Sequence, residues 1–374
     1  MQPTTFTRLL FAAALCGAAP MQASAQPTTD RPASLIVFPK VIADGTADTI
    51  IQIVNVSGST VHAHCFYVNG APASPNQPPG PANPPLWSTM DFAITLTQLQ
   101  PTHWVASRGR LNDPTDGTCS PIGPGHGTFN CDGAGFDPGL VPALPPGFRG
   151  ELLCYETDAV GAPMSGDHLI GTATVQHLSS GDVAKYNAIG ARGLQTNDSN
   201  GVLCLGGQVS AECPQGAEYD ACPDTWILNH LADGGGDPLG APGAAVTTNI
   251  TVVPCSHDLE HQLPQSVTLQ FLLTNEFEQT FSASTTVTCW AETPLGSIDP
   301  VFNRDSLGGQ LVQTRMRTVS GEGGFLVVAQ TLRTPSGPGA QTTSSIVNVH
   351  VEGTQSTGDV IRIPVESVQP EVVR

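Results

Sequence analysis

The feature that most limits the fold is a series of short segments in which β-branched residues alternate with polar ones. Examples are "TIIQIVNV" (49–56) and "TVHAHCFYV" (60–68), which are joined by a turn-forming stretch that contains Gly58. Apolar residues at every second position indicate strands, whereas helical spacing is nearly absent from this chain. The sequence therefore predicts an all-β fold.

The order of these segments repeats in the second half of the chain. "NITVVPC" (249–255) follows the pattern of 35–40, and "VTLQFLLTN" (267–275) follows the pattern of 49–55. Repetition of segments in a fixed order is typical of duplicated units, and six short strands are enough for a sandwich. We therefore expect two tandem β-sandwich domains with long Gly/Pro-rich loops. The expected limits are a first domain at 26–191, a cysteine-containing connector at 192–245, a second domain at 246–366 and a tail at 367–374.

This architecture resembles the immunoglobulin-like and fibronectin-like modules of bacterial envelope and secreted proteins. The resemblance rests on the repeated strand pattern alone and identifies no functional residue.

The first 25 residues have the layout of a secretory signal peptide. Arg8 precedes an apolar run at 9–19, and small residues at 23–25 precede Gln26. The run is too short to cross a bilayer, and no membrane-spanning segment is expected after its removal. We expect a secreted, periplasmic or cell-surface protein.

The charge of the chain excludes two classes of partner. The formal net charge is −18, and only two lysines, Lys40 and Lys185, occur in the chain. Nucleic acids and anionic membranes are bound through clusters of Lys or Arg, which this sequence lacks. The expected partner is a protein or a polysaccharide at the cell surface.

Nine cysteines remain after removal of residues 1–25, and in an exported chain they are disulfide candidates. The alternation places Cys65 and Cys154 toward the core, and we predict a bridge between them that joins two sheets. Cys255 is the nearest candidate for Cys289. The other candidates are Cys119 with Cys131 in a long loop, and Cys204 and Cys213 in the connector. An odd number leaves one thiol unpaired or bonded to another chain.

The densest group of possible metal ligands is "CSHDLEHQ" (255–262), with His257, Asp258, Glu260 and His261. Two histidines four apart suit zinc on a helix, but here they lie between expected strands, where a solvated loop is the alternative interpretation.

Two further groups are candidates for binding. His62 and His64 share one face of a strand, and Trp87 follows a proline-rich loop, where an aromatic ring can stack on a sugar. For these residues an outward polar face and core packing are the respective alternatives. No cofactor is evident. Calcium is possible at 112–117 and 196–201, although ordinary turns explain both segments as well.

No nucleophile elbow, zinc-protease motif or nucleotide-binding loop occurs in the sequence. The leading hypothesis is an exported, disulfide-braced protein with a non-catalytic binding or structural role. The alternatives are an extracellular metal-dependent or glycan-active enzyme and a surface assembly subunit joined by strand addition.

Overall fold

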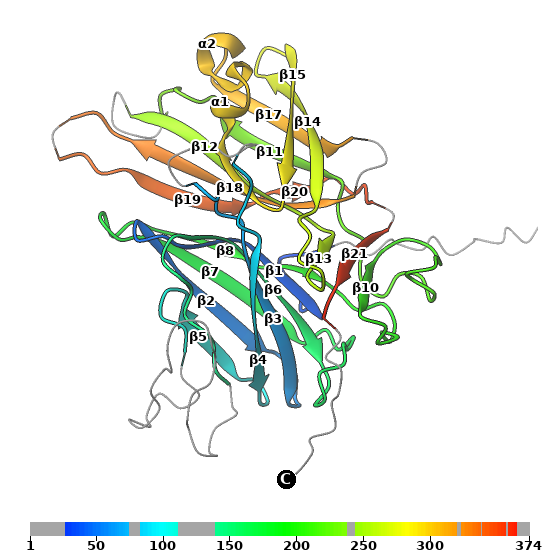
Figure 1. Cartoon of the computed structure of the whole chain (residues 1–374). Helices are drawn as coiled ribbons and strands as arrows, with labels where there is room; N and C mark the ends of the chain where they lie inside the picture. Colours follow the sequence, from blue (N-terminus) through cyan, green and yellow to red (C-terminus); the bar gives the residue numbers. More distant parts are fainter. Residues whose placement is uncertain are drawn as a thin grey trace, which may run out of the picture.

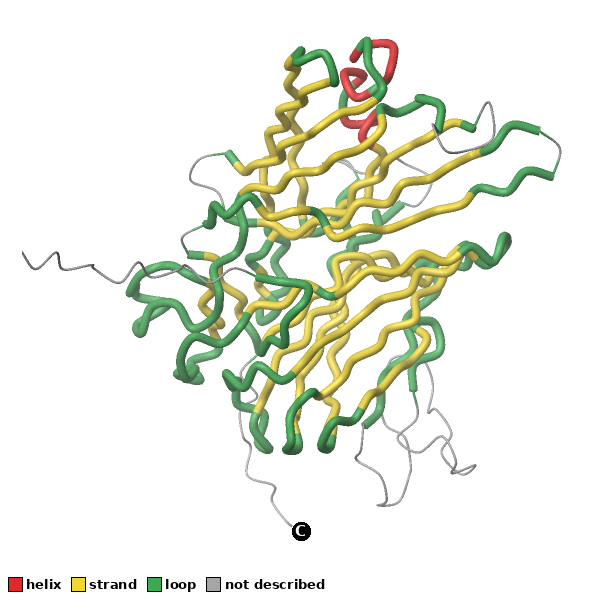
Figure 2. The backbone as a smooth tube through the Cα atoms, turned by 180° about the vertical axis from the view of Figure 1, so that it is seen from behind, coloured by secondary structure: helices red, strands yellow, loops and turns green. Residues whose placement is uncertain are grey.

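The structure is a computed structural model that describes residues 27–74, 83–110, 139–237, 244–319, 323–337, 339–356 and 358–364. Within these ranges the chain is all-β, and its helices are three short turns at one end of the molecule, α1 (Leu295–Ile298), η1 (Pro300–Phe302) and α2 (Arg304–Leu307). Figure 1 shows two layered bodies of strands stacked on one another, which we call the first and second sandwich. Figure 2 shows the same stacking from behind.

The first sandwich has two layers. One has the order β4-β3-β6-β1-β9 and the other β5-β2-β7-β8, and they are joined in the turn from β1 to β2, where Ala43 pairs with Asp48. The indole N–H of Trp104 donates to the Tyr67 hydroxyl at 2.6 Å and ties the layers together. The strands are β1 (Leu35–Ala43), β2 (Ala47–Asn55), β3 (Val61–Asn69), β4 (Ser88–Leu96), β5 (Pro101–Val105), β6 (Phe148–Thr157), β7 (Leu169–His177), β8 (Val183–Asn187) and β9 (Ile189–Ala191).

The second sandwich packs a five-stranded sheet, β15-β14-β17-β11-β20, on a four-stranded sheet, β16-β12-β18-β19. Buried Phe271, Leu273 and Phe302 form part of the core between them. Its strands are β11 (Thr225–Leu231), β12 (Ala245–Pro254), β14 (Ser266–Asn275), β15 (Thr280–Thr288), β16 (Ala291–Pro294), β17 (Leu311–Thr318), β18 (Phe325–Thr334), β19 (Thr343–Asn348) and β20 (His350–Val351).

A third, small sheet lies beside the two sandwiches and has the order β10-β21-β13. Its strands are β10 (Val202–Leu205), β13 (His257–Asp258) and β21 (Asp359–Arg362). The predicted connector is thus divided: β10 joins this sheet, whereas β11 is an inner strand of the second sandwich, paired with β17 and β20. The predicted domain limits stay predictions.

The predicted equivalence of the two halves is not confirmed at the level of strand neighbours. β2 pairs with β5 and β7, whereas β14, its expected counterpart, pairs with β15 and β17. The expected counterparts of β3, which are β15 and β16, also lie in two different sheets. Alternation in a sequence fixes which face of a strand is buried, but it does not fix which strand lies beside it.

Two disulfide predictions need correction. Cys65 and Cys154 are bonded, but they lie directly opposite each other on the neighbouring strands β3 and β6, so the bridge is within one sheet and not between sheets. Cys255 is bonded to Cys222 and not to Cys289, because β11 brings the connector against the second sandwich. Cys289 is a buried free thiol.

The remaining predicted cysteines have different outcomes. Cys204 and Cys213 form a disulfide. Cys119 and Cys131 lie outside the described residues, as does the possible calcium segment 112–117 and most of the two long loops. No helix in the described part of the chain is long and apolar enough to span a membrane.

Candidate functional site

The predicted metal cluster at 255–262 does not assemble. His257 is buried and points toward the first sandwich, whereas His261 is largely exposed and bonds to Asp258, with its Nδ1 3.0 Å from the carboxylate. Glu260 is exposed beside it. Successive side chains of a strand such as β13 point to opposite sides, which separates His257 from the others. Among the described residues, no three His, Cys, Asp or Glu side chains converge as metal ligands.

The three residues proposed for binding also have local partners. His62 Nδ1 lies 2.9 Å from the Thr95 hydroxyl, and His64 Nε2 lies 3.1 Å from Asp91 on the adjacent β4. Trp87 is buried, so it does not offer a stacking surface to a sugar. In the segment 196–201, Asn197 and Asp198 bond to Glu218 and to nearby backbone, as in ordinary turns.

The structure instead brings together a buried polar cluster where the two sandwiches meet, which we call the junction cluster: Trp87, Glu151, His257 and Cys289. Glu151 lies in β6, and its Oε1 is 3.3 Å from His257 Nε2 in β13. The His257 ring stacks on Trp87, with ring centres 6.1 Å apart. Glu151 is 0% exposed and His257 3%. Residues more than 100 positions apart in the sequence thus form one contact that is buried from solvent.

Burial sets the protonation of this cluster. It raises the pKa of Glu151 well above its ordinary value, and it lowers the pKa of His257 to about 4. Burial thus opposes the charged form of both groups in this contact. Burial, with a smaller effect of Glu151, also raises the pKa of the Cys289 thiol. A protonated, enclosed thiol is chemically inert, because the thiolate is the reactive form.

The cluster is incompletely hydrogen-bonded and locally strained. Both Glu151 oxygens, His257 Nδ1 and Trp87 Nε1 are buried without an aligned hydrogen-bond partner. Cys289 has φ 66° and Trp87 has φ 45°, in the left-handed region that side chains disfavour. The Trp290 N–H donates to the Thr288 carbonyl at 2.7 Å, which makes Cys289 the centre of a three-residue turn. This turn carries the chain from β15 in one sheet to β16 in the other.

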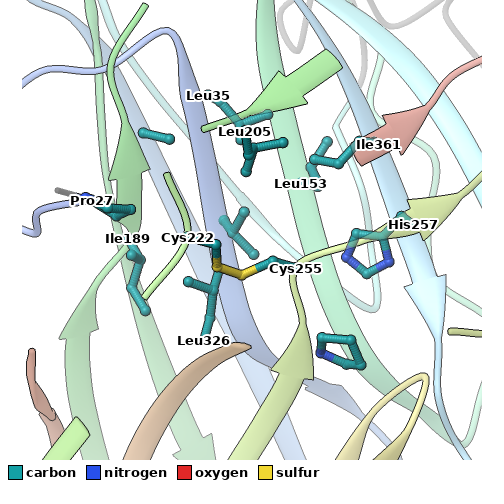
Figure 3. A pocket seen from close by; sticks show the side chains of 13 residues that line it. Pro27, Leu35, Leu153, Ile189, Leu205, Cys222, Cys255, His257, Leu326 and Ile361 are labelled. Atoms are coloured by element: carbon teal, nitrogen blue, oxygen red, sulfur yellow. A yellow bond between two sulfur atoms is a disulfide. The ribbon is translucent and has the colours of Figure 1, made fainter. Parts of the chain in front are cut away.

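A cavity of about 20 Å³ adjoins His257. Figure 3 shows His257 at one side of it, with the Cys222–Cys255 disulfide and side chains such as Leu35, Leu153 and Leu326 around it. This volume holds about one water molecule, and His257 is the only polar side chain in its lining. The cavity is too small for an organic ligand.

A buried ion-pair network lies next to the junction cluster. Lys40 in β1 is 2% exposed, and its ammonium donates to Glu292 in β16 and, at 2.7 Å, to Gln330 in β18. Arg149 bonds to Asp44 and lies 3.8 Å from Glu292. Burial opposes ionisation of Glu292, but Lys40 outweighs it and holds the pKa of this carboxyl below its ordinary value. The network joins the two sandwiches through paired charges.

Trp290 is the apolar anchor of the same junction. Its indole N–H donates to the Pro39 carbonyl at 2.7 Å, and its side chain covers Gly70 of the first sandwich. A Cβ on Gly70 would lie 2.3 Å from the Trp290 Cβ.

We expect Gly70→Ala to lower the free energy of unfolding by about 1–3 kcal/mol, because the added methyl group overpacks the junction. Gly58→Ala is the matched control, since the nearest atom to a Cβ there is 3.9 Å away, at the end of the Gln98 side chain. Chemical denaturation of both variants measures the difference. Equal stabilities of the two variants would contradict the close approach of Trp290 to Gly70.

A groove of about 900 Å³ lies on the outer face of the five-stranded sheet. Its lining is mostly polar and includes Thr225, Thr268, Gln270, Ser284, Arg315 and Arg317. Arg317 donates to the Gln270 amide oxygen from Nε at 2.9 Å and from Nη2 at 2.6 Å, whereas Arg315 bonds to Glu352. Asp224 and Asp359 also line the groove, and both accept hydrogen bonds from nearby side chains.

Sequence analysis missed this groove and the junction cluster. Glu151 and Lys40 are charged residues within apolar strands, which was the available signal for their burial. Arg315 and Arg317 alternate along "LVQTRMRT" on one strand face, which was the signal for the groove. No model of a known protein family matches the chain, and no curated protein is significantly similar to it.

Proposed function

We propose that this chain is an exported, non-catalytic binding protein that holds a carboxylated polysaccharide in the groove of the second sandwich. The observation that carries the proposal is the pairing of Arg317. Its guanidinium contacts the neutral amide of Gln270, so no carboxylate balances its charge at this contact. A ligand carboxylate can take the same two donors, and a bidentate guanidinium–carboxylate pair is stronger than one with an amide.

The rest of the lining suits a sugar polymer. Thr268 and Ser284 present hydroxyl groups that both donate and accept hydrogen bonds, as sugar hydroxyls do. The groove is open and extended over several strands, in contrast to the cavity at His257, which holds about one water. The non-catalytic role is supported by the enclosure of Glu151 and His257 in the junction cluster, where neither side chain is accessible to a substrate.

Export is supported by the three disulfides of the described residues, Cys65–Cys154, Cys204–Cys213 and Cys222–Cys255, because disulfides persist in oxidising compartments. These bonds are compatible with a periplasmic, cell-surface or extracellular location.

Calorimetric titration with uronic acid oligosaccharides tests the proposal. We expect Arg317→Gln to weaken binding about tenfold or more, since hydrogen bonds to a charged group contribute roughly 1.5–3 kcal/mol. Arg304→Gln is the matched control: it removes the same charge from an exposed position on α2, outside the groove, and should leave binding unchanged.

A neutral oligosaccharide of the same length should bind more weakly than the uronic acid form. Absence of binding to any carboxylated oligosaccharide, or equal binding by wild type and Arg317→Gln, would overturn the assignment of the groove.

A further inference from the structure

The outer strand of the second sandwich, β15, is a long sheet edge without the usual protection against pairing. It pairs with β14 over nine successive residues with no register shift, and no other described strand pairs with it. Its sequence, "TFSASTTVT", has no charged residue, proline or glycine. Natural edge strands are normally blocked by such residues, by bulges or by short length.

The other sheet edges of the described residues differ from β15. β8 and β19 cover each other, since the Asn348 side chain accepts from the Asn187 N–H and donates to the Asn187 carbonyl, at 3.1 and 2.8 Å. β16 and β20 are only four and two residues long. β4 is as long as β15 but carries the exposed Asp91. β15 is therefore the edge best suited to strand addition, and Figure 1 shows it at the outer end of its sheet in the second sandwich.

We propose that β15 pairs antiparallel with β15 of a second copy of this chain, about a two-fold axis at Ser284. This register places Thr280 opposite Thr288 and Ser282 opposite Thr286 of the second copy, so every pair on the exposed face joins two hydroxyl residues. The contact between β14 and β15 already has this form. Ser266 and Thr288 hydroxyls lie 2.8 Å apart, and Thr268 and Thr286 hydroxyls 3.1 Å apart.

The net charge of the chain limits where two copies can meet, and favours an uncharged contact between them over an acidic one. Each copy carries a formal net charge of −18, so most faces of two copies repel each other. β15 has no charge of its own. In the proposed register, Glu278 falls beyond the paired residues and does not face its own copy. The dimer extends the five-stranded sheet into the second copy and places its β15 beside Ser284 at the border of the groove. It does not depend on the groove's ligand.

Sedimentation of the exported full chain over a range of concentrations tests the inference. We expect a reversible monomer–dimer equilibrium that strengthens between about 10 and 150 mM salt, because the screening length falls from about 30 Å to about 8 Å and like charges repel less. A dimer interface held by ion pairs would instead weaken as the salt concentration rises. Cys289, the free thiol of the described residues, is buried and should not link two copies covalently.

Ser284→Lys places two ammonium groups face to face across the axis and is expected to weaken the dimer at least tenfold. Gln313→Lys is the control: it adds the same charge to an exposed residue of the inner strand β17, where the dimer should persist. Mixing Ser284→Lys with Ser284→Asp should restore pairing as a heterodimer. A wild-type chain that stays monomeric at 150 mM salt, or a Ser284→Lys variant that dimerises normally, would overturn the inference.

Discussion

Lys40→Met is expected to lower the free energy of unfolding by about 3–5 kcal/mol, because it leaves the Glu292 carboxylate buried without its main counter-charge. Lys40 and Gln330 lie on either side of the contact between the sandwiches, and the ammonium donates to both Glu292 and Gln330. Arg149, 3.8 Å from Glu292, remains in the variant and places the loss toward the lower end of this range.

The chain provides a matched control for this change. Lys185, the only other lysine, is exposed on β8, and Lys185→Met should change stability by less than about 0.5 kcal/mol. The double variant Lys40→Met with Glu292→Met removes both charges and should recover most of the loss. Equal stability of Lys40→Met and Lys185→Met would show that the network does not hold the sandwiches together.

The pH dependence of the Lys40→Met deficit follows from Glu292. Its pKa is lowered in the folded wild type, so its contribution to stability is present above the unfolded value of 4.5 and is lost as pH falls through the folded pKa. Without Lys40, burial opposes ionisation of this carboxyl and only Arg149 is left to offset it, so its pKa is higher in the variant than in the wild type. The deficit should therefore be largest near neutral pH and shrink toward acid pH, which denaturation at several pH values measures.

The sequence was sufficient for the fold class and for single strands, because alternation reports directly on burial of one strand face. Ile51 and Ile53 in β2 and Phe271 and Leu273 in β14 are buried at the alternating positions. Alternation in the sequence does not show which strand lies beside which in a sheet. Cys65 faces the core as expected, but its bond to Cys154 runs along a sheet because β6 lies beside β3.

The candidate sites were less predictable, since they depend on contacts between segments far apart in the chain. Glu151 and His257 are separated by the whole connector and meet only because β13 packs on β6. The spacing of His257 and His261 indicated a shared site, but β13 directs His257 inward and leaves His261 exposed. A local pattern could not show that Cys222 would replace Cys289 as the partner of Cys255.

Glu151→Met is expected to raise the stability of the protein at neutral pH by about 1–3 kcal/mol, because an apolar side chain of similar size removes the cost of burying a carboxyl without aligned hydrogen bonds. The gain should depend on pH. The folded pKa of Glu151 is raised by burial, so the folded state binds more protons than the unfolded state above the unfolded value of 4.5. The contribution of Glu151 to the stability of the wild type is therefore largest below pH 4.5, and it is lost as the pH rises from this value through the folded pKa.

His257 has the opposite pH dependence, since its pKa falls from 6.5 to about 4 on folding. Its contribution to the free energy of unfolding is therefore largest above pH 6.5 and is lost as the pH falls from 6.5 to 4. The two effects oppose each other between pH 4.5 and 6.5, and above 6.5 only Glu151 continues to act.

The difference in unfolding free energy between Glu151→Met and wild type should thus grow from pH 4.5 upward, by up to about 1.4 kcal/mol per pH unit, until the folded pKa is passed. Glu156→Gln is a matched comparison: burial raises the pKa of Glu156 only to about 7, so its difference should stop growing there. A Glu151→Met difference that is constant from pH 4.5 to 8 would mean that Glu151 stays ionised in the folded protein and forms an ion pair with a charged His257.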